Sequence, residues 1–314
     1  MPRLKLGGTP RRAKAAFTLV EVLVTLLIMG IIGTALTRVM VKQQQAYRDS
    51  AKEADMSREI RLTSSLLPAE LRSTSSSGGD VLEMDEDKVT FLANIGSSIV
   101  CAKVGNTHVV LPPLNTAGIT TTNWYSQPSV GDSVMLYNDS LSAGSEDDVW
   151  TRRPINSFTW GMFGFCPGAP YTDPVLDAGK QRFMVGIGAT GTPDSVKVGA
   201  VVRFARPVRY SIYAASSGRW YVGYQEYMNG AWTATEAVGG PYNRFLPGDA
   251  NPSGLQFRYF DSTGVRLFNV ADRLSVSRVD VYLRANGGMA AVTERKQNLL
   301  RDSVMMRIAV RNFK

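Results

Sequence analysis

Cysteine and histidine are scarce in this chain of 314 residues. It has two cysteines, Cys101 and Cys166, and a single histidine, His108. Zinc sites draw their ligands from clusters of these residue types, most often with a C-x-x-C pair, and no such pair occurs here. The composition therefore argues against a zinc domain, and we expect no metal or other cofactor.

Acidic residues are absent from the first 16 positions. Lys and Arg number 35 against 27 Asp and Glu, for a net charge of +8, and five of the basic residues precede Phe17: Arg3, Lys5, Arg11, Arg12 and Lys14. Such an N-terminal excess is typical of a segment that stays on the cytoplasmic side of a membrane. Because little basic excess remains for the rest of the chain, we expect no nucleic-acid partner.

Charge is also nearly absent from 17–36, where Glu21 is the only charged residue. A helix of about 20 residues spans about 30 Å, the thickness of the hydrocarbon core. A cleaved secretory signal would have a shorter apolar region and a small-residue cleavage site after it. With no proline or glycine from 34 to 67, we predict one helix over 17–67, membrane-spanning to about residue 36 and ending before Pro68.

Glu21 is the unusual residue of this segment. A charged side chain at the centre of a membrane helix costs about 2.5–3.5 kcal/mol on insertion scales, and such residues tend to mark function. A plain single-pass anchor with a stray acid is the simplest alternative. The combination of Glu21 with a basic leader and Phe17 favours a specific role instead.

The stretch RRAKAAFTLVEVLVTLLIMGIIGTAL, residues 11–36, resembles the N-terminus of type IV pilins and type II secretion pseudopilins. In that family a membrane peptidase cuts just before the Phe and methylates the new amino terminus. The resemblance implies that residues 1–16 are a leader, cleaved between Ala16 and Phe17. The family favours glycine before the cut, and alanine is the next smallest residue. The resemblance also implies that Glu21 pairs with the amine of Phe17, in its own or a neighbouring subunit, during filament assembly.

The composition changes after Pro68. The run STSSSGG at 73–79 predicts a flexible link, so we assign a linker to 68–80. From Val81 onward the apolar runs are short and rich in β-branched and aromatic residues, which is typical of strands. The predicted strands are 88–93, 98–104, 107–111, 133–137, 181–187, 196–203 and 208–214.

Hairpins and further strands are predicted towards the C-terminus. Asn229 and Gly230 separate two alternating segments, which indicates a two-residue hairpin turn, and a second turn is expected at 261–264. The run LSVSRVDVYLRA predicts a long strand. The alternation of apolar residues from Val304 to Val310 predicts a last strand with one buried face.

A long helix followed by an antiparallel sheet is an α+β arrangement, and it is also the layout of pilin-like proteins. We therefore expect a β-rich globular domain over 81–314 that packs on the second half of the helix. Residues 112–180 are rich in turn-forming types and predict an irregular insertion, a set of long loops or a second sheet. The spacing of GLQFRYFDSTG and RLSVSRVDVYL resembles the C-terminal halves of J-type pseudopilins and W-type minor pilins.

The two cysteines leave two alternatives open. If the globular domain lies outside the cytoplasm, a disulfide between Cys101 and Cys166 becomes plausible. By the loop-entropy relation, closing that separation would contribute about 4 kcal/mol. Two unpaired buried thiols are the alternative.

Other patterns are weak indications of chemistry. GIGATG at 186–191 matches a dinucleotide motif, but a strand-like run follows where that motif requires a helix. Cys101 and His108 flank a turn without a third orienting residue. The acidic residues at 83–87 and 146–148 lack the alternating spacing of a calcium loop, and solvated turns explain them. We therefore expect no catalytic residues.

The resemblance implies a minor subunit, at the tip or at initiation, of a type IV pilus. It would be a single-pass protein of the bacterial inner membrane, with a cytoplasmic N-terminus and its globular domain outside the cytoplasm, before it enters the filament. Its expected partners are the prepilin peptidase, other minor and major pilins, and the membrane. The alternatives are a J-type pseudopilin of a type II secretion system, or a membrane-anchored binding or enzyme domain.

Overall fold

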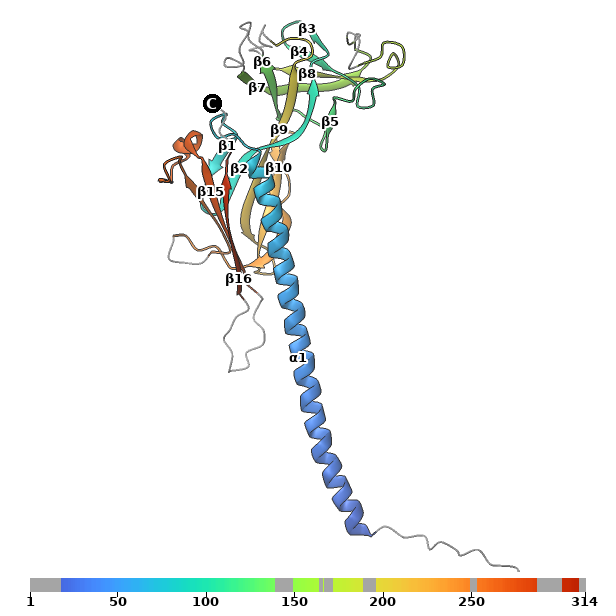
Figure 1. Ribbon diagram of the computed structural model, residues 1–314, viewed down its shortest axis with the longest axis vertical. Coiled ribbons are helices and arrows are strands. Elements are labelled where there is room, and N and C mark those ends of the chain that lie inside the picture. Colours follow the sequence, from blue (N-terminus) through green and yellow to red (C-terminus); the bar gives the residue numbers. More distant parts are fainter. Residues whose placement is uncertain are drawn as a thin grey trace, which may run out of the picture. The chain divides into compact units, whose positions relative to one another are not determined.

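The computed structural model describes residues 18–138, 149–163, 166, 172–188, 196–248, 253–286 and 301–310. The chain forms two compact units, Met1–Ala54 and Asp55–Lys314. Helix α1 (Leu19–Arg72) contributes to both units, and all the strands belong to the second (Figure 1). The long N-terminal helix and the antiparallel sheet confirm the predicted α+β class.

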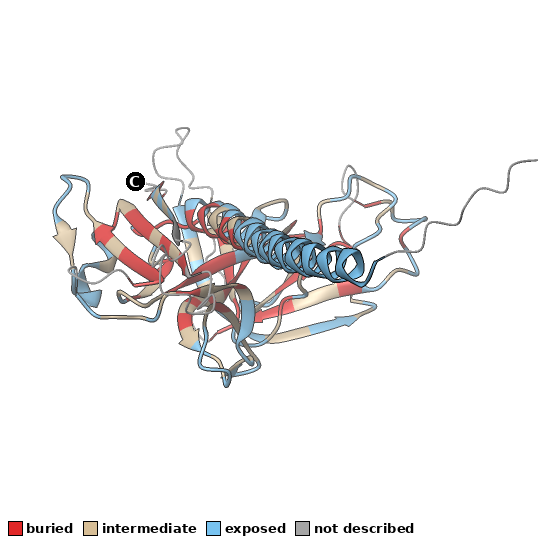
Figure 2. Ribbon diagram, turned by 90° about the horizontal axis from the view of Figure 1, so that it is seen from below, coloured by how far each residue is buried: buried red, intermediate tan, exposed pale blue. Residues whose placement is uncertain are grey.

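Burial along α1 changes where the second unit begins. Every described residue from Thr18 to Asp55 is exposed, whereas Met56, Ile60 and Leu67 are buried, as Figure 2 shows by colour. Only the last third of the helix, from Met56 onward, therefore packs on the sheet, a shorter part than the predicted second half.

The predicted end of the helix at Leu67 is wrong, because α1 passes through Pro68 and continues to Arg72. Proline inside a helix removes a hydrogen bond and costs about 3 kcal/mol. Leu67 and Leu71 are completely buried, and each such side chain stabilises the fold by about 1.5–3 kcal/mol. Packing of this last turn on the sheet therefore offsets the cost of the proline.

The predicted flexible linker at 68–80 is also wrong. Its first residues are helical, and Ser75 and Ser76 are buried. The Ser75 amide donates to Asp80 Oδ2 at 2.7 Å, and the Ser76 hydroxyl donates to the carbonyl of Val276. The serines thus replace solvent contacts by hydrogen bonds to the domain, which fixes the chain between helix and sheet.

The strands pair antiparallel in a connected sheet with the path β14-β13-β15-β12-β10-β9-β6-β7-β8-β4-β3. Five strands lie off this path or extend it, with β1 and β5 on β2, β2 on β9, β11 on β10 and β16 on β15. The bounds are β1 Val81–Met84, β2 Lys88–Ile99, β3 Ala102–Val104, β4 His108–Leu111, β5 Asn123–Trp124, β6 Ser133–Asn138, β7 Val149–Gly161, β8 Arg182–Ile187, β9 Val201–Ala214, β10 Trp220–Met228, β11 Ala231–Trp232, β12 Glu236–Tyr242, β13 Leu255–Phe260, β14 Arg266–Leu267, β15 Arg278–Asn286 and β16 Arg301–Ala309.

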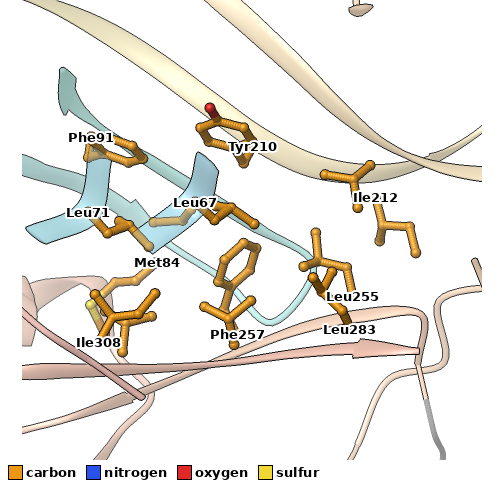
Figure 3. Close-up of a cluster of buried hydrophobic side chains, with 14 of the residues drawn as sticks. Leu67, Leu71, Met84, Phe91, Tyr210, Ile212, Leu255, Phe257, Leu283 and Ile308 are labelled. Carbon is orange, nitrogen blue, oxygen red and sulfur yellow. The ribbon is translucent and has the colours of Figure 1, made fainter. Parts of the chain in front are cut away.

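The first hydrophobic core lies between the end of α1 and the sheet. Leu67 and Leu71 pack between the side chains of β2 and β9 on one side and those of β13 and β16 on the other (Figure 3). Phe91 of β2 and Tyr210 of β9, with ring centroids 6.2 Å apart, form part of the first of these two sides. This core holds the helix against the domain.

A second hydrophobic core lies farther along the same long strands. Its buried residues come from the end of β2, from β4, β6, β7 and β8, and from the start of β9. Trp124 packs edge-on against Phe183 at 4.7 Å between ring centroids. We call the part built around this core the distal module; β2 and β9 connect it to the helix-bound core.

The distal module includes the range 112–180, where we expected an irregular insertion, a set of long loops or a second sheet. Most described residues of this range lie outside strands, and its three strands join the main sheet: β6, which was predicted, and β5 and β7, which were not. The first part of β7 pairs with β6 and its second part pairs with β8. Ile155 is the only fully buried residue of β7, so the strand has little of the apolar alternation by which it could have been predicted.

Two predicted strands, 196–203 and 208–214, are largely one strand, β9. Pro207 separates the two predicted segments in the sequence. It lies at the point where the neighbouring strand on one side of β9 changes from β6 to β10. A proline is tolerated there because no continuous ladder on that side needs its missing amide.

The predicted turns are confirmed. Asn229 and Gly230 both have positive φ, at 52° and 85°, as a type I′ turn between β10 and β11 requires. The Asp261 carboxylate accepts from the amides of Thr263 and Val265, and it closes the turn between β13 and β14.

Candidate functional site: the N-terminal helix

Thr18 caps the start of α1. Its carbonyl and its hydroxyl both accept from the Glu21 amide, at 3.1 and 3.3 Å. Glu21 lies in the first helical turn and is exposed. The pattern Thr-x-x-Glu is that of a capping box, and a carboxylate in the first turn also interacts favourably with the positive end of the helix dipole. The local sequence thus places Glu21 at the very start of the membrane-length segment.

The segment that follows exposes a continuous apolar surface. Its large apolar side chains from Leu19 to Val41 are between 46% and 77% exposed. It is the one described helix long and apolar enough to cross a membrane. An exposed apolar surface of this size is typical of a segment that contacts lipid or other protein chains.

The polar groups of this segment are satisfied within the helix. Thr25, Thr34 and Thr37 each donate their hydroxyl to a backbone carbonyl one turn earlier, at 2.7–2.8 Å. These hydroxyls therefore need no water, which suits a hydrocarbon environment. No protein atom lies within 4 Å of the position that a Cβ would take at Gly30 or Gly33. The helix is continuous through both glycines, which leaves room there for a neighbouring backbone.

Glu21 has no basic side chain near it along the described helix. The next basic residue is Arg38, about 25 Å further along the axis at 1.5 Å per residue. The predicted cleavage and methylation positions, Ala16 and Phe17, lie outside the described residues, as does the whole basic leader.

Cys101 and Cys166 form a disulfide, with their Cα atoms 4.9 Å apart. This decides between the two alternatives that the sequence left open. It also removes the thiol from any pairing with His108, whose Nδ1 lies 2.9 Å from the Thr107 hydroxyl. The bond links Cys166 to Cys101, next to β3 of the distal module.

The remaining weak patterns gain no support as ligand sites. Within the described ranges, no group of three or more His, Cys, Asp or Glu side chains is arranged to hold a metal ion. Glu83 instead pairs with Arg209 at 2.9 Å, and Glu86 pairs with Arg266 at 3.0 Å. The first two residues of GIGATG lie inside β8, and its last three residues, 189–191, fall outside the described residues.

The sequence analysis missed a buried ionic cluster around Arg206. This fully buried guanidinium donates to both carboxylate oxygens of Asp132 at 2.9 Å, to Glu226 at 2.8 Å and to Ser126 at 2.6 Å. Alternation along β9 places Arg206 on the same face as Phe204, so strand parity was the signal that could have found it.

A second cluster of polar side chains lies where the end of α1 meets β9 and β10. Burial raises the pKa of the Glu70 carboxyl, although a hydrogen bond from Tyr210 opposes the shift. Burial also raises the pKa of Tyr224, whose hydroxyl donates to Glu226 at 2.9 Å. Tyr210 and Tyr224 have ring centroids 5.1 Å apart, so polar side chains continue from the last turn of the helix to the Arg206 cluster.

Comparison with known proteins identifies one family model, the prokaryotic N-terminal methylation motif, at residues 11–37. No curated protein and no solved structure shows significant similarity to the chain. The motif implies processing by a prepilin peptidase and assembly with other pilins, and the apolar helix fits a membrane anchor. The N-terminal segment of this chain therefore supports its assignment as a type IV pilin-like or pseudopilin precursor.

Proposed function

We propose that the protein is a minor subunit of a type IV pilus that acts at the tip or at initiation and has no catalytic activity of its own. It is inserted in the inner membrane as a prepilin, with its globular domain outside the cytoplasm. Cleavage between Ala16 and Phe17 and methylation of Phe17 then prepare it for the filament. The methylation motif followed by a fully exposed apolar helix is the observation that carries this proposal.

The role of Glu21 follows from the energies that act on it. At the centre of a membrane helix a charged side chain costs about 2.5–3.5 kcal/mol, and nearer the ends of the helix it costs less. The positive end of a helix dipole stabilises a nearby carboxylate by about 0.3–1 kcal/mol, and by at most about 2 kcal/mol in favourable geometry. Glu21 lies in the first turn, so the dipole offsets part of this cost, and a cation would offset the rest when the carboxylate enters apolar surroundings. We propose that the ammonium of a cleaved Phe17, four positions earlier in the sequence, is that cation, in the same subunit or the next.

The size of the second unit supports a position at low copy number. It extends from Asp55 to Lys314 and carries the distal module in addition to the core that packs on α1. A domain of this size would crowd a shaft in which every subunit repeats closely. At the tip, the distal module has free space around it.

Glu21→Gln tests the assembly role more sharply than Glu21→Ala. Glutamine keeps the size and the capping capacity of the side chain but not its charge. Loss of one partner of a buried ion pair typically costs about 3–5 kcal/mol. We expect Glu21→Gln to insert in the membrane normally and to fall below detection in purified pili, whereas the exposed helix variant Glu53→Gln assembles as the wild type does. Normal incorporation of Glu21→Gln would show that the carboxylate is not needed.

The mass of the mature N-terminus tests processing independently. We expect a chain that begins at Phe17 and carries one added methyl group. A chain that retains Met1 in assembled fibres would contradict the proposal. A J-type pseudopilin would share this processing, but its deletion would stop protein secretion and leave pili intact.

A further inference from the structure

Strand β16 forms one margin of the sheet, because among the described strands it pairs only with β15 (Figure 1). Opposite residues of an antiparallel pair alternate between those that exchange backbone hydrogen bonds and those that do not. Arg284 of β15 uses both its amide and its carbonyl on the side away from β16, with Gly254 at 2.8 Å and Asn243 at 3.0 Å. Ser303, which lies opposite Arg284, therefore turns its own amide and carbonyl away from β15.

The same alternation continues along β16. The amides and carbonyls of Ser303, Met305 and Arg307 all point away from β15, and we call these three residues the free edge. Outside the ladder with β15, the described chain offers their backbone no hydrogen bond, and all three residues are exposed. A row of such groups is a template for another extended polypeptide, whereas lipid and nucleic acid present no matching row of amides and carbonyls.

The side chains between the free-edge residues point towards the first hydrophobic core. Val304 and Met306 are half-buried and pack against that core. Because side chains alternate along a strand, a strand added at the free edge would cover Val304 and Met306 with every second residue. Those residues of the added strand should therefore be apolar.

The opposite face of β13, β15 and β16 is positively charged. Its described residues include one carboxylate, that of Asp280, against four arginines: Arg258, Arg278, Arg284 and Arg307. Asp280 pairs with Arg278 at 3.0 Å, and it is 4.0 Å from Arg307, whose side chain is 70% exposed. Burial and the nearby charge of Arg258 lower the pKa of Arg284. The outward residues of an added strand should therefore be acidic.

We propose that an extended strand of another protein pairs with the free edge of β16 and carries apolar and acidic side chains in alternation. A second copy of β16 fits less well. It would bring a second Arg307 to the positive face, and its other described residues on that face, at positions 303, 305 and 309, include no carboxylate. Like charges on neighbouring strands are destabilising. This interface does not rest on the proposed function.

Photo-crosslinking in cells tests the identity of the occupant. The full-length protein carries p-benzoylphenylalanine in place of Met305 or, as a control, in place of Tyr125, which is 79% exposed in the distal module. We expect position 305 to crosslink to a segment of another protein in which Asp or Glu alternates with apolar residues, and position 125 not to reach that segment. A crosslink from 305 to a second copy of this chain, to a segment without this alternation, or to nothing would overturn the proposal.

Ser303→Pro tests whether the backbone edge carries the binding. Proline removes the outward amide of residue 303 but no hydrogen bond of the ladder with β15, so it is tolerated at a sheet edge. Ser303→Ala is the matched control, which keeps the amide. With the crosslinker at position 305, we expect Ser303→Pro to lower the crosslink yield about tenfold relative to Ser303→Ala, with the same Tm for both. Equal yields would overturn the proposal.

Arg307→Glu tests the charge without altering the backbone. The substitution replaces an attraction to the partner's carboxylates by a repulsion, so the yield should fall about tenfold, with Arg307→Gln intermediate. Replacement of the nearest acidic residue in the crosslinked segment by Lys should restore the yield for Arg307→Glu and lower it for the wild type. Equal yields from the wild type and Arg307→Glu would overturn the proposal.

Discussion

Arg206→Met probes the ionic cluster that joins the two cores. Methionine keeps most of the length of the side chain but removes the guanidinium. The substitution leaves Asp132, which is fully buried, without its bidentate partner, and it removes a hydrogen bond at 2.8 Å from Glu226. Ser129 still donates to Asp132 through its amide at 2.8 Å, so the carboxylate is not entirely without donors.

The expected cost follows from burial. Removal of one partner from a buried ion pair destabilises a protein by about 3–5 kcal/mol. For a domain of this size about 1 kcal/mol corresponds to 2–4 °C in Tm, so Arg206→Met should lower Tm by about 6–20 °C. Arg209→Met is the control on the same strand. Arg209 pairs with a half-exposed Glu83 and lies over Trp232, and its loss should cost about 1–2 kcal/mol.

Thermal and urea unfolding of the full-length protein in detergent, followed by tryptophan fluorescence, measures both variants. Addition of Asp132→Asn to Arg206→Met should recover part of the loss, because asparagine leaves no buried charge unpaired. The reasoning is refuted if Arg206→Met destabilises the protein no more than Arg209→Met does.

Three further predictions concern the disulfide and two buried side chains. The double variant C101A/C166A should lower the free energy of unfolding by about 4 kcal/mol, because a loop of 65 residues is no longer closed in the unfolded chain; calorimetry with and without reductant measures this. Glu70→Gln should stabilise the protein at pH 7. Burial raises the pKa of this carboxyl, and its Oε2 has no hydrogen-bond partner, so the wild type loses stability as pH rises through that pKa. Urea unfolding should show that the free energies of unfolding of variant and wild type differ less below pH 4 than at pH 7. An equal difference at both pH values would show that ionisation of Glu70 is not the cause. Burial raises the pKa of Tyr242 to about 12. The stability that this tyrosine contributes is complete below its ordinary pKa of about 10 and is lost as pH rises towards 12. Between pH 10 and pH 12, unfolding curves should therefore show a smaller loss of stability for Tyr242→Phe than for the wild type.

Local patterns were sufficient for a large part of the fold. The largely apolar run from Phe17 to Leu36 predicted the helix, because a run of about twenty residues matches the hydrocarbon thickness whatever else the chain contains. Asn229 and Gly230 predicted their turn, because few residue pairs adopt positive φ at both positions. The alternation from Val304 to Val310 predicted β16 for a similar reason, since a sheet with one buried face requires it.

The candidate site was likewise predictable from the sequence only where local effects determine it. Glu21 and its place in the first turn followed from the sequence, because capping and the cost of a charge in lipid are local effects. Contacts at long sequence separation were not predictable. The choice between a disulfide and two free thiols depends on whether Cys101 and Cys166 meet across 65 residues.

The sequence by itself determined the long apolar helix, its glutamate, the methylation motif and most strands, because each depends on residues within one or two turns or one strand. Tertiary structure alone decided that α1 continues through Pro68, that β7 is a strand, and which distant carboxylates pair with Arg206. In each of these cases packing or ion pairing with distant residues outweighs a local preference of about 3 kcal/mol or less.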